Sequence, residues 1–436
     1  MGEGTAERRA GTIGRATGGA QDRWYRRTTM SDDGPASRPV LAVPKASTVT
    51  SLRQRNRAAV LKQIILSQET TRATIAKECD LSAASATNLV AELIGDGLVH
   101  ETGSISSRGG RPITLIAPCP DSAYAIGADI GERGVAVELF DLSMRRVDRE
   151  FRGGGAPETP KRIALELGEA VDALRARNPE ASERLLGIGL GLPGLVETAP
   201  DGRQTLYAQS LGWPAVPIED LIRTDVPVYA ENGAKTQAKA ELWFGAARGV
   251  KHALVVLLGR GSGLGVVADG KLAVGASGSA GEWGHTKIVR GGRPCRCGNL
   301  GCIEAYVGAD AILEAWRELG GTFDGTGWGA LGALIDAAHA GEPAARTVLD
   351  DVIDTLGASL GGMVNLTNPQ RIVVGGWVGL RLMETCALQI ETAIRANALT
   401  RLGAQFELFT STFGGDTVAL GSALMPVEAL IADAPD

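Results

Sequence analysis

Apolar residues recur at the spacing of an amphipathic helix in three successive segments, which predict helices over 51–66, 72–78 and 83–94. A hydroxyl side chain that can cap a helix N-terminus begins or precedes each segment, at Ser51, Thr71 and Ser82. Two short extended segments follow, joined by a glycine-rich turn, and predict a hairpin of strands over 98–102 and 112–117. These elements together predict a winged helix-turn-helix domain over 49–118.

The exposed start of the third predicted helix carries small and amide side chains, which can enter a major groove and reach base edges. We therefore expect DNA contacts from Ser82, Ala84, Ser85, Thr87 and Asn88. The predicted wing adds Arg108 and Arg111, whose guanidinium groups can reach a phosphate or a minor groove. The alternative is a three-helix module that binds a partner other than DNA.

After Pro118-Cys119-Pro120, short apolar segments alternate with glycine loops and amphipathic helices. The apolar segments predict strands over 123–129, 135–141, around Val147, and over 186–190, 226–230, 253–258, 266–268 and 371–374. Helices are predicted over 159–175, before Phe244, within 310–340, and over 343–365 and 419–431. Repeated strand, glycine loop and helix units indicate an α/β fold whose ligands bind at the strand ends.

Composition and charge limit the classes of protein to which this chain can belong. No run approaches the roughly 18 apolar residues of a membrane span, and the N-terminus has no apolar core of a secretory signal, so we expect a cytoplasmic protein. Residues 1–48 have no apolar periodicity and predict a disordered basic tail, within which Met30 is an alternative start. Residues 1–116 hold 16 Lys and Arg against 11 Asp and Glu, whereas the remainder holds 28 against 39. A basic front on an acidic body favours contact with a polyanion.

Three of the six cysteines lie within eight residues, at Cys295, Cys297 and Cys302, and His285 lies ten residues before the first of them. Three thiolates and one imidazole form a complete tetrahedral set for Zn²⁺ with no position left for water. Such a closed site is structural, so the zinc would shape a loop rather than activate a nucleophile. The alternative is a group of reduced, buried cysteines without metal.

Two carboxylates flank the cysteine cluster, Glu282 before His285 and Glu304 after Cys302. A loop held by zinc would fix both on one rim, and carboxylates accept hydroxyl hydrogen bonds, which suits a polyhydroxylated ligand. The alternatives are two surface charges, or a nucleic-acid-binding knuckle that uses Arg290, Arg293 and Arg296.

From Ser51 to the C-terminus the chain resembles the ROK family of repressors, uncharacterised frames and sugar kinases. The resemblance rests chiefly on Gly281-Glu282-Trp283-Gly284-His285 with the three clustered cysteines, Gly298, Gly301 and Glu304. Further matches are Gly191-Leu192-Pro193-Gly194, Trp243-Phe244-Gly245 and Gly375-Gly376. The resemblance implies an actin-like fold with a sugar between two lobes, which we place at 119–245 and at 246–436, the second with the zinc loop and C-terminal helix.

By the same resemblance, zinc would be held by His285, Cys295, Cys297 and Cys302, and the sugar would face Glu282, His285, Glu304 and Asn232. The kinases of the family carry Asn-Asp where this chain has Asn232-Gly233, and glycine has no group to accept a proton from the sugar. Their phosphate loop reads Asp-x-Gly-Gly-Thr, whereas here Glu132 and Arg133 follow Asp129-Ile130-Gly131. Arg260 and Lys235 are further departures, and the space left by the missing Asp, together with Lys235, suits a phosphorylated sugar.

These patterns favour a sugar-responsive transcriptional regulator, a repressor of carbohydrate metabolism, with a non-catalytic sugar-binding domain. We expect operator DNA and a sugar or sugar phosphate as partners, and a homo-oligomer that is a dimer or a tetramer. The alternative is an ATP-dependent sugar kinase with a fused DNA-binding domain.

Overall fold

The computed structural model describes Met1 and residues 49–106, 112–131, 134–153 and 159–432. The chain divides into two units, Met1–Thr48 and Val49–Asp436, and the fold below is that of the second. Several expectations lie outside the described residues: the disordered tail with Met30, the wing contacts of Arg108 and Arg111, and the departures at Glu132 and Arg133.

The front of the second unit is formed by three helices and a small sheet, namely α1 (Val49–Ser67), α2 (Arg72–Glu78), α3 (Ala83–Gly95), β1 (Thr70–Thr71), β2 (Val99–Ile105) and β3 (Ile113–Pro118). The sheet order is β1-β3-β2. The hydroxyls of Thr71 and Ser82 accept from the backbone N–H groups of Thr74 and Ser85, as expected of caps. The expected cap at Ser51 is wrong: α1 already begins at Val49, because no proline or glycine stops it there, and Ser51 lies inside its first turn.

A five-stranded sheet of order β11-β7-β4-β5-β6 follows, which we call the first sheet. Its strands are β4 (Tyr124–Gly131), β5 (Gly134–Asp141), β6 (Arg146–Arg152), β7 (Leu185–Leu192) and β11 (Val228–Asn232). β4, β7 and β11 are parallel, and β5 is antiparallel to its neighbours. Helix α4 (Pro160–Arg177) packs on β5 and β6 and buries one apolar face, and α5 (Pro179–Glu183) leads into β7.

A three-stranded sheet that the sequence pattern did not reveal connects β7 to β11. It has the order β10-β9-β8, with β8 (Leu195–Thr198), β9 (Gln204–Tyr207) and β10 (Val216–Pro217). The Gln204 side chain ties it to β11, because its amide donates to the Ala230 carbonyl and accepts from the Ala230 N–H.

The second five-stranded sheet has the order β14-β13-β12-β15-β16, and we call it the second sheet. Its strands are β12 (Ala253–Leu258), β13 (Ser262–Ala268), β14 (Lys271–Leu272), β15 (Arg371–Gly375) and β16 (Glu407–Thr410). The helices that accompany it are α7 (Glu304–Val307), α8 (Ala309–Glu318), α9 (Gly327–His339), α10 (Pro343–Thr367), α11 (Gly376–Asn397) and α12 (Thr400–Gly403). The largest hydrophobic core of the described residues lies between this sheet and these helices.

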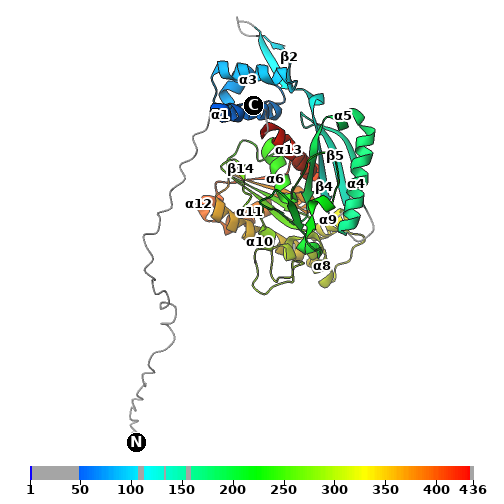
Figure 1. Cartoon of the computed structure of the whole chain (residues 1–436). Coiled ribbons are helices and arrows are strands. Elements are labelled where there is room, and N and C mark those ends of the chain that lie inside the picture. Colours follow the sequence, from blue (N-terminus) through cyan, green and yellow to red (C-terminus); the bar gives the residue numbers. More distant parts are fainter. Residues whose placement is uncertain (2–48, 107–111, 132–133, 154–158, 433–436) are drawn as a thin grey trace, which may run out of the picture. The chain divides into compact units, whose positions relative to one another are not determined.

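Two helices lie against each other at the centre, α6 (Gly233–Phe244) and α13 (Thr417–Ala432) (Figure 1). Gly421 allows their close contact, because a Cβ there would overlap the Thr236 carbonyl oxygen. α6 packs on β12 and β13 of the second sheet.

The expected placement of the C-terminal helix in the second lobe is wrong, because α13 packs on β4 and β7 of the first sheet. Gly127 and Gly189 make room for it: a Cβ on either would overlap the Ala419 or the Ser422 carbonyl. In length and composition Gly414–Ala432 is a candidate membrane span, but it is 61% buried inside the protein, as a core helix is.

The front module shares a hydrophobic core with this helix pair. Val60, Leu61 and Ile64 of α1 belong to the same buried cluster as Trp243 of α6 and Val427 of α13. The module is therefore packed directly on the elements that join the two sheets.

Candidate functional site

A cleft of about 650 Å³ lies between the two sheets, at the carboxyl ends of the central strands. One side is lined by the ends of β4 and β7, the other by the β12–β13 turn and the start of α11, and the floor by the first residues of α6 and α13. The cleft brings together all four residues expected to face a sugar, Asn232, Glu282, His285 and Glu304.

The segment Gly281–His285 lies backbone to backbone against β13, and its two glycines explain why. A Cβ on Gly281 would overlap the Leu264 carbonyl, and one on Gly284 would overlap the Ser262 carbonyl. Gly281 also has φ +99°, which disfavours any other residue. This close contact fixes the backbone of Glu282 at the rim of the cleft.

Glu282 and Glu304 differ in the hydrogen bonds that their carboxylates already make within the protein. Glu304 is 6% exposed, and its carboxylate accepts the Ser262 N–H at 3.0 Å and lies 3.5 Å from Arg296 Nη2, so it anchors the β12–β13 turn. Glu282 makes no side-chain hydrogen bond within the described part of the chain. Burial raises its pKa, an effect that His285 and Lys235 oppose and Glu304 adds to. Glu282 is therefore the carboxylate best placed to accept ligand hydroxyls.

The four expected metal ligands converge. One ligand atom from each of His285, Cys295, Cys297 and Cys302 lies within 4.8 Å of all the others. The distances from Cys297 Sγ to Cys302 Sγ and from Cys295 Sγ to His285 Nδ1 are both 3.7 Å. A tetrahedron with Zn–S bonds of about 2.3 Å has edges of about 3.8 Å, so the arrangement fits zinc.

The surroundings of the cluster also suit thiolate ligands. Lys287 Nζ donates to Cys302 Sγ at 3.0 Å, and Asn299 Nδ2 donates to Cys297 Sγ at 3.6 Å. Burial raises the pKa of the Cys295 thiol, and a bound cation would favour its thiolate form. A zinc ion here would fix the loop between Glu282 and Glu304 and supply no open coordination position.

Asn232 reaches the cleft, but its side chain also serves the fold. Its Oδ1 caps α6 by accepting the Ala234 N–H at 2.8 Å, and its Nδ2 donates to the Gly194 carbonyl at 2.8 Å. The next residue, Gly233, begins α6, and a Cβ there would meet only ordinary contacts at 3.7 and 3.9 Å. Glycine at 233 is therefore not imposed by space, and its effect is the absence of a proton-accepting side chain.

Lys235 is not placed to help bind a phosphorylated sugar in the cleft. The side chain is 2% exposed, its ammonium donates to the Gly278 carbonyl, and it lies 3.3 Å from Glu231 Oε1. Lys235 does not line the cleft. It instead ties α6 to the segment that precedes the zinc loop.

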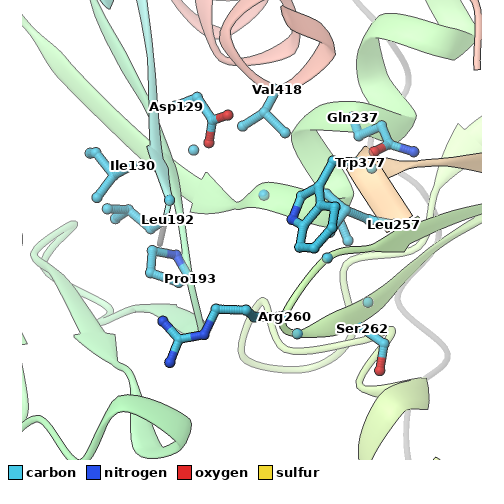
Figure 2. A pocket seen from close by; sticks show the side chains of 18 of the residues that line it. Asp129, Ile130, Leu192, Pro193, Gln237, Leu257, Arg260, Ser262, Trp377 and Val418 are labelled. Atoms are coloured by element: carbon cyan, nitrogen blue, oxygen red, sulfur yellow. The ribbon is translucent and has the colours of Figure 1, made fainter. Parts of the chain in front are cut away.

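On the second-sheet side of the cleft, sequence reasoning missed Trp377 and noted Arg260 only as a departure from the family pattern. Figure 2 shows Trp377 and Arg260 there, opposite Ile130, Leu192 and Pro193. Trp377 packs beside Gly259 at the start of the β12–β13 turn, and Arg260 Nε forms an ion pair with Asp310 at 2.9 Å. Trp377 follows the Gly375-Gly376 pair, which was the only available signal of its position.

A charged cluster lies beside the cleft on the first sheet. Glu138 of β5 is 1% exposed and lies 3.3 Å from both Arg146 and Arg149 of β6. Both arginines also pair with Asp416, just before α13. Burial, and next the charge of Asp416, raise the pKa of Glu138 to about 7 against the arginines.

The expected DNA-reading residues lie together on the exposed start of α3. Ser82, Ala84, Ser85, Thr87 and Asn88 are all exposed, whereas Ala86, Leu89 and Val90 are buried. The Ser82 and Thr87 hydroxyls are engaged within the helix, by the Ser85 N–H and the Ala83 carbonyl.

The two sheets, the central helix pair and the cleft define an actin-like, two-lobed α/β protein. A model of the ROK family matches residues 125–428, and the chain belongs to this family. A xylose repressor of Caldicellulosiruptor bescii is 31% identical over 336 residues, 75% of this chain and 84% of the repressor. A glucokinase of Halalkalibacterium halodurans is 31% identical over 310 residues, 68% of this chain and 93% of the kinase.

Among solved structures, a ROK family transcriptional regulator, described as a homologue of the E. coli MLC protein, matches with a TM-score of 0.69. It is 24% identical and covers 88% of this chain and 97% of its own. At this sequence identity the match shows only that the two proteins share a fold. The regulator aligns with 88% of this chain, whereas the glucokinase aligns with 68% of it.

Proposed function

We propose that this protein is a sugar-responsive transcriptional regulator that binds operator DNA through a winged helix-turn-helix at 49–118. One observation carries the proposal: α1 of the front module shares a buried core with α6 and α13, whose first residues line the cleft. A ligand in the cleft and DNA on α3 would then act on one connected set of helices. The relative named xylose repressor supports this function.

In this proposal the cleft holds an aldose through Glu282, with His285, Glu304 and Asn232 around it. A structural zinc on His285, Cys295, Cys297 and Cys302 holds the loop that carries these carboxylates. The DNA is read by the start of α3, with Arg108 and Arg111 of the wing on the phosphates. The protein acts in the cytoplasm as a dimer or tetramer, because two helix-turn-helix modules read two half-sites of an operator.

The experiment measures operator binding with and without sugar. A duplex is selected from a randomised library by the ligand-free protein, and its binding is followed by fluorescence anisotropy during titration with D-xylose, D-glucose and their phosphates. We expect at least one aldose to change the dissociation constant of the duplex by fivefold or more, within the usual range of allosteric coupling. No sequence-selective DNA binding, or no response to any of these sugars, would overturn the proposal.

An ATP-dependent sugar kinase is the second candidate, favoured by the glucokinase relative and by a carboxylate, Asp129, that lines the cleft. Against it stands Gly233, which offers no proton acceptor at the start of α6. A coupled assay for ADP release with the same aldoses separates the two. We expect no turnover above the background of the Asp129→Asn variant, and turnover lost in that variant would favour the kinase.

A further inference from the structure

Helix α1 and the residue that follows it contact both the first sheet and the central helix pair α6 and α13. Beyond its end, Gln68 Nε2 donates to the Ser143 carbonyl at 2.9 Å, in the turn between β5 and β6 of the first sheet. Six residues earlier, Lys62 Nζ lies 4.5 Å above the centroid of the Trp243 ring, near the end of α6. α6 packs on β12 and β13 of the second sheet and on α13, which packs on the first sheet, so the second contact connects α1 to the helix pair between the sheets.

Glu428 of α13 accepts hydrogen bonds from two side chains of α6 beside the second contact. Its Oε1 accepts the Trp243 indole N–H at 3.1 Å, and its Oε2 accepts from the Lys239 ammonium of α6. Trp243 is 2% exposed. Burial lowers the pKa of Lys62, while the charge of Glu428 opposes this. A cation over an indole ring interacts more strongly when it is desolvated, so this contact is more than a surface pairing.

Both helices that meet α1 here begin in the cleft. Gly233, Ala234 and Gln237 of α6 and Val418 of α13 line it, and Gly421 against Thr236 holds the two helices in contact. α6 has 12 residues, which span about 18 Å at 1.5 Å per residue. A shift of this helix pair at the cleft therefore reaches Trp243 through one rigid helix.

We propose that Lys62, Trp243 and Glu428 form the coupling joint through which the cleft sets the placement of the DNA-binding module. This inference rests on the proposed function and names the residues that regulate it. Sugar between the lobes moves the pair α6 and α13 relative to the turn between β5 and β6 of the first sheet. Because α1 is attached to the first sheet at Ser143 and to α6 at Trp243, the movement tilts α1. Without the Lys62 contact, α1 keeps only its apolar packing on α6 and α13 and follows their movement less closely.

The test uses the full-length protein, the selected duplex and the aldose that gives the largest response in wild type. Lys62→Met keeps the aliphatic stem and removes the charge that lies over Trp243. We expect near wild-type sugar affinity by calorimetry and near wild-type DNA affinity without sugar. The factor by which sugar changes DNA affinity should fall about fivefold or more, or to unity if the wild-type factor is smaller. Lys62→Arg, which retains a cation over the ring, should keep most of the response.

Lys161→Met is the matched control, because Lys161 is an exposed lysine on α4 at the far side of the first sheet from α13. It should respond like wild type. A Lys62→Met protein that keeps the full sugar response would overturn the joint and leave the proposed function standing. If Lys62→Met does not fold, Glu428→Gln tests the same joint, since it keeps an acceptor for the indole and removes the charge. A wild-type protein without any sugar response overturns the proposed function itself.

Discussion

Replacing Glu282 by Gln tests the sugar site most directly, because the change keeps the shape of the side chain and removes its charge. In the described part of the chain no protein donor binds this carboxylate, so both oxygens are available to ligand hydroxyls. A hydrogen bond to a charged acceptor is worth about 1.5–3 kcal/mol, against about 1 kcal/mol for a neutral one. With both oxygens engaged, loss of the charge should therefore cost about 1–4 kcal/mol, and about 1.4 kcal/mol corresponds to tenfold in sugar affinity.

The assay is calorimetric titration of the variant with the aldose that acts on wild type, followed by operator binding in the same sugar series. Zinc content, melting temperature and operator affinity without sugar should stay near wild type, because Gly281 and Gly284 fix the local backbone. Glu304→Gln is the contrasting variant: it should also lower the melting temperature, since Glu304 holds the Ser262 N–H. A Glu282→Gln protein that binds the sugar as tightly as wild type would refute the reasoning and place the ligand elsewhere.

Three further outcomes follow from other parts of the molecule. Cys297→Ser should reduce zinc below one ion per chain in elemental analysis and abolish the sugar response while operator binding largely survives; full zinc content would contradict the ligand set. Asn88→Ala should lower the preference for the selected duplex over random DNA. Unchanged selectivity in competition binding would mean that Asn88 does not read a base. Burial raises the pKa of Glu138 from its ordinary value of 4.5 to about 7 in the folded protein, so between these pH values the folded state binds an extra proton and loses stability as pH rises. The free energy of unfolding of Glu138→Gln, measured in urea, should therefore rise relative to that of wild type between pH 5 and pH 8, by at most about 3 kcal/mol. If the difference between the two proteins does not change with pH, Glu138 does not titrate in this range.

Local signals allowed the elements to be predicted, and they failed where distant contacts decide. Thr71 and Ser82 cap their helices as expected, because capping depends on residues three positions away. The strand over 253–258 has the expected bounds, since its apolar run ends at a glycine turn. The packing of α13 on the first sheet could not be read from its own residues, because it depends on glycines at 127 and 189.

The candidate site shows the same division. The spacing of one histidine and three cysteines was enough to expect a cluster, and the structure brings these four side chains together. The sequence did not reveal that Lys235 is buried against Gly278, or that Arg296 approaches Glu304. Both contacts depend on where a loop returns in space, which no local pattern records.

The position of α13 has a consequence for how the protein is made. The first sheet is complete in the chain at Asn232, but the helix that covers β4 and β7 and meets α1 begins only at Thr417. At about 5–20 residues per second, a ribosome needs roughly 10–40 s to synthesise the residues between them. During that interval the glycine face of the sheet and the apolar side of α1 remain uncovered. A premature stop codon before Thr417 would leave a nearly complete chain that exposes the apolar surfaces of the first sheet and of α1. Such surfaces favour aggregation and chaperone binding.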